Sequence, residues 1–241
     1  MNVYDYILTA QHSHRPILAV LLDPEKNKAC HALPYVNLAD IILIGGSTGT
    51  CQTDIINQLR ECTSCPLVLF PGNVTQFAAQ ADALLFLSVL TARSADVLIE
   101  PHIQAAIPIR TSRIETIPMG YILIDGGRKS SVEIVTHSTP IPQSDISGIV
   151  STAIAGELLG KHLIYLEAGS GAKQPVAPAI IQAVRQQVSV PLIVGGGICH
   201  PEQMIGAYEA GADIVVIGNY FEQHPEQLPL FIAKKNQYVT P

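Results

Sequence analysis

The sequence PLIVGGGI at residues 191–198 and the sequence IVVIGNYFE at residues 214–222 contain the pattern from which the fold is predicted. Each is a short, continuous run of Ile, Leu and Val that leads directly into glycine. Continuous apolar runs of this length are typical of strands that are covered on both faces, as in a parallel sheet with helices around it. A strand that alternates with a helix is the repeating unit of an α/β fold.

Short apolar runs of this kind recur along the whole chain. There are eight, at residues 17–22, 41–44, 67–70, 83–89, 121–124, 163–166, 192–194 and 214–217. Stretches of helical composition, such as residues 54–61, 177–188 and 202–210, separate most of them. Eight such units in 241 residues predict a (β/α)8 TIM barrel, with residues 1–241 as one domain. A doubly wound open sheet is the alternative, but it normally has a glycine-rich turn after its first strand, where this chain has Asp23 and Pro24.

Two connections depart from the regular pattern. Only about a dozen residues separate the third run from the fourth, close to the minimum for a parallel crossover, and they begin with Pro71-Gly72-Asn73. The third helix is therefore expected to be truncated or missing. Residues 125–161, in contrast, form a long insertion after the fifth strand, in which RKSSVEIVTHSTPIP (128–142) predicts an extended segment and residues 144–159 a helix. An insertion at this end of a barrel strand is where a lid or substrate-binding loop lies.

Composition narrows the classes of protein to consider. The chain is 48% hydrophobic and 14% charged, with a net charge of −6. Its densest basic runs are Arg128-Lys129 and Lys234-Lys235, so it lacks the basic face that nucleic-acid binding requires. Five cysteines without a secretory signal argue against a disulfide framework. The first apolar run, residues 16–22, is too short to span a membrane, so we expect a cytoplasmic protein.

The glycines after the last two strands favour a phosphate site. Glycine lets backbone N–H groups approach phosphate oxygens closely, and a helix start adds unpaired donors and a positive dipole. Barrels often hold phosphate with the loops after strands seven and eight, which here contain Gly196-Gly197 and Gly218-Asn219. The alternative is that the first of these glycine runs is only a tight turn.

The ends of the first two strands carry oxygen ligands. Asp23 follows the first strand in LLDPEK (21–26), and Ser47 follows the second in LIGGSTGT (43–50). Neighbouring strands of a barrel end at the same face, so a carboxylate and a hydroxyl here could hold Mg²⁺, which binds few protein ligands together with substrate phosphates. Alternatively, Asp23 is a helix cap before Pro24.

A carboxylate also ends the sixth strand, in YLEAGSGA (165–172). Tyr165 and Glu167 are two residues apart, so their side chains share one face of the strand, and we expect them to point into the mouth of the barrel. Glu167 there could accept hydrogen bonds from substrate hydroxyls or remove a proton. The alternative is a buried glutamate paired with Lys173 or Arg128.

These motifs occur together in an order that resembles a known family. LLDPEK, LIGGSTG, FPGN, YILIDGGRKSSVE, YLEAGSGA, VGGGI and IGN follow one another along the chain, and together they resemble the geranylgeranylglyceryl phosphate synthase family, which includes the bacterial heptaprenylglyceryl phosphate synthases. The resemblance covers about residues 15–232 and includes the barrel that lacks a regular third helix. Leu21 stands where members of the heptaprenyl type have lysine, and the forms of YLEAGSGA and RKSSV are more similar to the geranylgeranyl-type group.

The resemblance implies a prenyltransferase of ether-lipid biosynthesis. It would join a polyprenyl diphosphate, of geranylgeranyl length, to the C3 hydroxyl of sn-glycerol 1-phosphate and release diphosphate. It also implies homo-oligomers, either dimers or hexamers, and a long apolar groove for the prenyl tail, compatible with peripheral membrane contact.

Carried over position by position, the resemblance implies the following site. Mg²⁺ would be bound by Asp23 and Ser47. Glycerol 1-phosphate would be bound by Tyr165, Leu166, Glu167, Ala168, Gly169, Ser170 and Gly171, with Gly196, Gly197, Gly218 and Asn219 on its phosphate. The mechanism that these residues suggest has two catalytic residues: Glu167 orients the attacking hydroxyl and either takes its proton late or only aims the hydroxyl, and Tyr165 holds the glycerol.

Two other functions fit a phosphate-binding barrel. A phosphosugar isomerase or epimerase would share the phosphate loops but needs an acid and a base across the barrel and little apolar groove. A protein that only binds a phosphorylated metabolite would bind glycerol phosphate without turnover. Release of diphosphate from a prenyl substrate separates both from the prenyltransferase.

Overall fold

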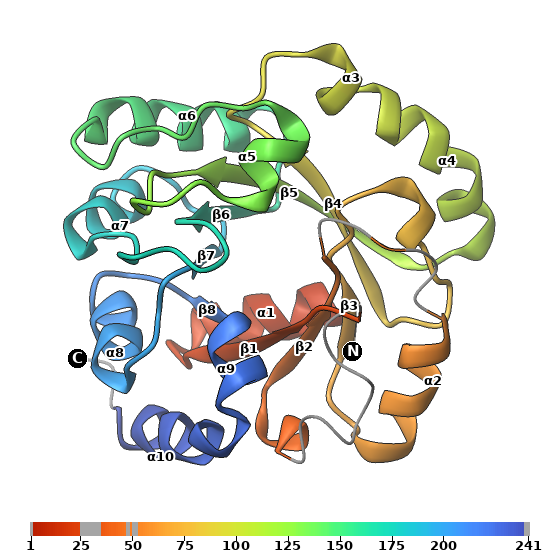
Figure 1. Cartoon of the computed structure of the whole chain (residues 1–241), viewed down its shortest axis with the longest axis horizontal. Helices are drawn as coiled ribbons and strands as arrows, with labels where there is room; N and C mark the ends of the chain where they lie inside the picture. The colour runs from red at the N-terminus through yellow and green to blue at the C-terminus, as the bar shows by residue number, and fades with distance from the viewer. Residues whose placement is uncertain (1, 25–34, 47–48, 50–52, 239–241) are drawn as a thin grey trace.

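Eight parallel strands form a closed barrel in the computed structural model, which describes residues 2–24, 35–46, 49 and 53–238. The strands are β1 (Ile17–Leu22), β2 (Ile41–Ile44), β3 (Leu67–Leu69), β4 (Ala83–Val89), β5 (Glu115–Leu123), β6 (Leu163–Glu167), β7 (Leu192–Gly195) and β8 (Ile214–Ile217). They pair in the order of the sequence, and β8 pairs with β1 to close the barrel (Figure 1). The predicted TIM barrel is confirmed.

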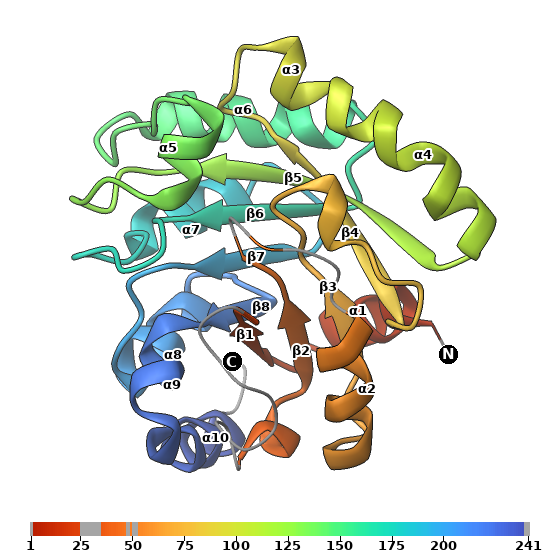
Figure 2. The same cartoon turned by 45° about the vertical axis from the view of Figure 1, so that its right-hand side comes forward.

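Most of the helices pack around the outside of the barrel (Figure 1). The structure contains α1 (Val3–His12), α2 (Thr53–Cys62), α3 (Ala95–Leu98), α4 (Glu100–Ser112), α5 (Ser131–Thr136), α6 (Ile146–Leu158), α7 (Pro178–Arg185), α8 (Pro201–Glu209), α9 (Asn219–Gln223) and α10 (Leu228–Gln237), with 3₁₀ turns η1 (Val36–Leu38), η2 (Val74–Gln76) and η3 (Pro225–Gln227). Helices α6, α7 and α8 follow one another around the barrel (Figures 1 and 2). Within the described ranges, every helix is too short or too polar to cross a bilayer.

Side chains of each strand alternate between two apolar layers. On β6, Leu163 and Tyr165 belong to the cluster inside the barrel, whereas Ile164 and Leu166 belong to the cluster between the barrel and its helices. All five residues of β6 are buried. Because both faces of the strand are covered, the sequence reads as a continuous apolar run instead of an alternating one.

Helix α1 closes the end of the barrel where the strands begin. Val3 and Ile7 are buried and line a small cavity with interior residues of the strands. The carboxylate of Glu115, at the start of β5, accepts the backbone N–H groups of Val3 and Tyr4 at 2.6 and 2.8 Å. The N–H groups in the first turn of a helix have no partners inside the helix. These two hydrogen bonds to Glu115 satisfy two of them and hold α1 against the barrel.

Of the two predictions for the irregular connections, the structure confirms one and contradicts the other. Between β3 and β4 the described helical structure consists of the single turn η2, as the sequence predicts. In the insertion after β5, the prediction of an extended segment at 128–142 is wrong, because this segment contains helix α5. Ser130 starts this helix, since its Oγ accepts the N–H of Glu133 at 3.1 Å, and His137 ends it with φ of 51°. Local capping therefore outweighs the β-branched composition.

The backbone directly after β2 passes very close to the backbone directly after β3, and this contact can be tested by mutation. A Cβ on Gly45 would lie 1.8 Å from the carbonyl oxygen of Phe70, whereas a Cβ on Gly206 in α8 would meet no atom within 4 Å. We expect Gly45→Ala to lower the free energy of unfolding by about 3 kcal/mol and Gly206→Ala to raise it by about 0.5–1 kcal/mol. Urea unfolding of both variants measures this; equal stabilities would contradict the close approach.

Candidate active site

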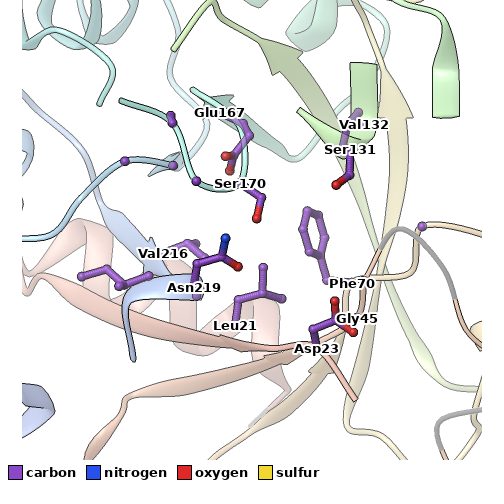
Figure 3. Close-up of a pocket in the computed structure, with 18 of the residues that line it drawn as sticks. Leu21, Asp23, Gly45, Phe70, Ser131, Val132, Glu167, Ser170, Val216 and Asn219 are labelled. Atoms are coloured by element: carbon purple, nitrogen blue, oxygen red, sulfur yellow. The ribbon is translucent and has the colours of Figure 1, made fainter. Parts of the chain in front are cut away.

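A pocket opens where the strands end, opposite α1. Its walls come from nearly every strand end, including Asp23 after β1, Phe70 after β3 and Glu167 at the end of β6. In the view of Figure 3, Glu167, Ser170 and Asn219 lie on one side of this central pocket and Asp23 on the other. The pocket thus occupies the face where TIM barrels carry their active sites.

Tyr165 and Glu167 line the pocket together, from the inward face of β6. The Tyr165 hydroxyl hydrogen-bonds to the Glu167 carboxylate, and Glu167 Oε1 accepts the backbone N–H of Gly169 at 2.7 Å. Glu167 is only 8% exposed and Tyr165 1%. In the described part of the chain, neither of the alternative partners, Lys173 and Arg128, forms an ion pair with Glu167.

Burial governs the electrostatics of this pair. It raises the pKa of Glu167, although the hydrogen bonds from Tyr165 and from Gly169 N–H act in the opposite direction. Burial, followed by the negative charge of Glu167, holds the pKa of Tyr165 well above its usual value. Tyr165 therefore remains a neutral donor, and Glu167 is a stronger base than an exposed glutamate.

An aromatic cluster, formed by Phe70, Tyr121 and Tyr165, covers the bottom of the pocket. The rings of Tyr121 and Tyr165 meet edge to face with centroids 5.4 Å apart, and Phe70 lies 5.7 Å from Tyr165 and 6.3 Å from Tyr121. Sequence reasoning missed Phe70 and Tyr121 as site residues. Strand register supplies the signal for Tyr121, because it is the direct neighbour of Tyr165 in the sheet.

Gly195, the last residue of β7, and Gly196 after it make room for Tyr165 and Glu167. A Cβ on Gly195 would lie 2.3 Å from the Tyr165 hydroxyl, and one on Gly196 would lie 2.4 Å from Glu167 Oε1. Gly196 and Gly197 also have φ of 81° and 71°, which side chains rarely tolerate. The run GGG thus has a packing role in addition to the expected phosphate role.

The predicted glycerol phosphate residues separate into two groups. Those that line the pocket are Tyr165, Glu167, Ser170, Gly171, Gly196, Gly197, Gly218 and Asn219. Leu166 and Ala168 face the opposite way, into the layer beneath the helices. Gly169 lies outside the lining and contributes its N–H to Glu167. The alternation of β6 causes this division, because a continuous segment of a strand cannot present every side chain to one pocket.

Asp23 is the described half of the predicted metal site, and Ser47 lies outside the described residues. Asp23 lines the pocket, and a Cβ on Gly46 would lie 2.7 Å from its Oδ1, so the carboxylate reaches the end of β2. In the described ranges there is no cluster of three acidic, His or Cys ligands. A carboxylate in this position fits Mg²⁺, which takes one or two protein carboxylates together with phosphate oxygens and water.

A second, apolar cavity adjoins the central pocket. The two share the residues Pro71, Gly72, Leu87 and Val132. The apolar cavity continues between β4 and α4, where it is lined by Leu84, Phe86 and Ile109 among others. It lies on the side of the barrel where η2 replaces a full helix, so the truncated connection helps to open it.

The fold and the site define a TIM-barrel protein with a polar pocket at its strand ends that continues into an apolar cavity. The chain belongs to the PcrB family, whose profile matches residues 12–235.

Named relatives and a solved structure extend this comparison. The chain is 44% identical to a geranylgeranylglyceryl phosphate synthase of Flavobacterium johnsoniae, covering 92% of this chain and 94% of the relative. It is 42% identical to the Zunongwangia profunda protein of the same name, covering 92% and 97%. The crystal structure of the (S)-3-O-geranylgeranylglyceryl phosphate synthase from Thermoplasma acidophilum, in complex with sn-glycerol-1-phosphate, superimposes with a TM-score of 0.92 at 29% identity, covering 99% of this chain and 100% of that one.

The buried carboxyl predicts a pH-dependent difference in stability. Because its folded pKa is raised, folded Glu167 keeps a proton that unfolded Glu167 releases above about pH 4.3. Wild-type stability therefore falls as the pH rises from the unfolded pKa to the folded pKa. Glu167→Gln has no such proton, so we expect its stability relative to the wild type to increase over this range. Urea midpoints from about pH 4 to about pH 8 measure it; a difference independent of pH would contradict the raised pKa.

Proposed function

We propose that this protein transfers a geranylgeranyl group from its diphosphate to the C3 hydroxyl of sn-glycerol 1-phosphate, forming an ether-linked prenylglyceryl phosphate and diphosphate. The observation that carries the proposal is the position of Glu167: a buried carboxylate between glycine-rich loops and an apolar cavity. Membership of the PcrB family and the names of the relatives support the same activity.

The glycerol phosphate site is proposed on the β6 side of the pocket. The backbone N–H groups of Gly196, Gly197 and Gly218 and the side chains of Ser170 and Asn219 offer hydrogen-bond donors for phosphate oxygens. All of them line the central pocket together with Glu167, and Ser170 and Asn219 lie on the same side of it as Glu167 (Figure 3). Glycerol bound there would have its free hydroxyls near the carboxylate.

Glu167 is proposed to act as hydrogen-bond acceptor and base. It accepts a hydrogen bond from the C3 hydroxyl and aims that oxygen at the allylic carbon of the prenyl diphosphate. The bond between that carbon and the diphosphate oxygen breaks with its electron pair leaving on diphosphate, while the new C–O ether bond forms. The hydroxyl proton passes to Glu167, and Tyr165 keeps the carboxylate in place through its hydrogen bond.

Asp23 is proposed to hold Mg²⁺ for the diphosphate, with Ser47 as the second ligand implied by the sequence. Bound Mg²⁺ supplies positive charge against the negative charge that develops on the leaving diphosphate. The fit is supported by the oxygen chemistry of Asp23 and by its position across the pocket from Glu167.

The apolar cavity is proposed to hold the prenyl tail. It meets the central pocket at Leu87 and Val132, so a tail could extend from the diphosphate between β4 and α4 without entering water. Burial of about 0.8 kcal/mol per CH₂ would provide most of the affinity for this substrate.

The outer face of α4 is proposed to be the surface through which the protein contacts a second copy of itself or a membrane. Ile103 and Ile107, one turn apart on this helix, are 60% and 78% exposed, and Ile99 before it is 53% exposed. A row of exposed apolar residues of this kind supports the homo-oligomer or peripheral membrane contact expected from the sequence. A cytoplasmic location stays a prediction of the sequence.

An assay of the purified protein tests the activity. We expect conversion of sn-glycerol 1-phosphate with geranylgeranyl diphosphate, when a ladder of C10 to C35 diphosphates is offered, with release of diphosphate. Chelation of divalent cations with EDTA should abolish turnover, and added Mg²⁺ should restore it. Product formed only with the enantiomeric sn-glycerol 3-phosphate would reject the proposed substrate, and tight binding without turnover would favour the non-catalytic alternative.

Replacement of the carboxylate tests the mechanism. We expect Glu167→Gln to lower kcat by at least about 100-fold, the contribution typical of a positioned base, because glutamine keeps the shape of the side chain but cannot take the proton. Steady-state kinetics at saturating concentrations of both substrates measures the effect. Near-normal turnover would show that Glu167 is not the base.

A further inference from the structure

The central pocket has little positive charge of its own. The carboxyl groups that line it are those of Asp23, Glu167 and Glu222, and its described lining contains no Lys, Arg or His. The proposed substrates both carry phosphate groups, whose transfer from water into a pocket is costly unless charge or hydrogen bonds compensate it. A cation is therefore expected at the edge of the pocket.

Arg128 brings a guanidinium to that edge. A Cβ placed on Gly171 would lie 3.4 Å from Arg128 Nη1 and 3.6 Å from the side-chain nitrogen of Asn219. Gly171 and Asn219 both line the pocket, so the guanidinium lies next to the wall on which the glycerol phosphate site is proposed. Arg128 belongs to the RKSS sequence in the insertion after β5, where a substrate-binding loop is expected.

The guanidinium of Arg128 has no other partner in the part of the chain that the structure describes. Arg15, Arg60 and Arg185 each form an ion pair with an aspartate. Arg128, in contrast, takes part in no hydrogen bond or ion pair with any residue of the described ranges. Its five N–H donors are therefore available to an anion.

The loop that carries Arg128 is held against the loop after β6. The backbone N–H groups of Lys173 and Gln174 donate to the carbonyl of Gly126 at 2.9 and 3.2 Å. On the other side of Arg128, Ser130 is buried, and a Cβ on Gly169 would lie 2.8 Å from the Ser130 Cβ. These contacts fix the backbone on both sides of Arg128 and so restrict where its side chain can reach.

We propose that Arg128 binds the phosphate of the glycerol phosphate substrate, completing the site formed by Gly171, Asn219 and the glycine loops. The planar guanidinium would donate two parallel N–H groups to two phosphate oxygens, which a lysine cannot do. This inference rests on the proposed function. The loop after β5 would then supply the positive charge that the residues lining the pocket do not provide.

Kinetics of Arg128→Ala tests the inference. We expect the KM for sn-glycerol 1-phosphate to rise about 10- to 100-fold, the effect of a lost charge-assisted pair, while kcat and the KM for geranylgeranyl diphosphate change less than about threefold, because ground-state and transition-state binding are lost equally. Arg128→Lys should give an intermediate KM. Titration calorimetry with sn-glycerol 1-phosphate alone should show the same weakening.

Arg110→Ala is the matched control. Arg110 is an exposed arginine of α4 that lines neither the central pocket nor the apolar cavity, so its removal changes the net charge equally and should leave both KM values unchanged. An unchanged KM in an active Arg128→Ala enzyme, or a rise in the KM for the prenyl diphosphate instead, would overturn the inference. A wild-type protein that neither binds nor converts sn-glycerol 1-phosphate would overturn the proposed function and this inference with it.

Discussion

The buried carboxyl of Glu167 is the constraint on which the architecture of the pocket depends. A carboxylate without partners is costly inside a protein, and this one is supplied with the Tyr165 hydroxyl and the Gly169 N–H. Gly195 and Gly196 leave the space that these groups fill. The end of β6, the loop that follows it and the end of β7 are thus shaped around one acid, which is consistent with a proton acceptor held in a defined position.

The pocket divides into a polar part and an apolar part, and this division corresponds to the chemistry of a reaction that joins a small phosphorylated polyol to an apolar chain. The polar part lies on β6, β7 and β8, and the apolar cavity lies along β4 and α4. Between them, the rings of Phe70, Tyr121 and Tyr165 form a water-poor floor. In such surroundings electrostatic interactions are stronger than in water, so a charge or hydrogen-bond donor placed beside the reacting atoms would stabilise the charge that develops there more strongly than it would in solvent.

The sequence predicted the strands more reliably than the insertion after β5. Continuous apolar runs locate strands because both faces of a parallel strand are covered. The segment containing α5 was predicted to be extended from its β-branched residues, but Ser130 and His137 cap a short helix there. Its conformation depends on a few hydrogen bonds and on contact with the loop after β6. A propensity summed along the chain does not contain that information.

By itself, the sequence determined the closed arrangement of eight strands, the truncated third connection, and the placement of Asp23 and Glu167 at strand ends, because each follows from local periodicity and from the topology of a barrel. Only the tertiary structure decided which side chains meet. It brought the rings of Phe70 and Tyr121 together with Tyr165, and it brought the guanidinium of Arg128 next to Gly171. Distances between loops far apart in the chain depend on how the layers pack, and no local pattern encodes them.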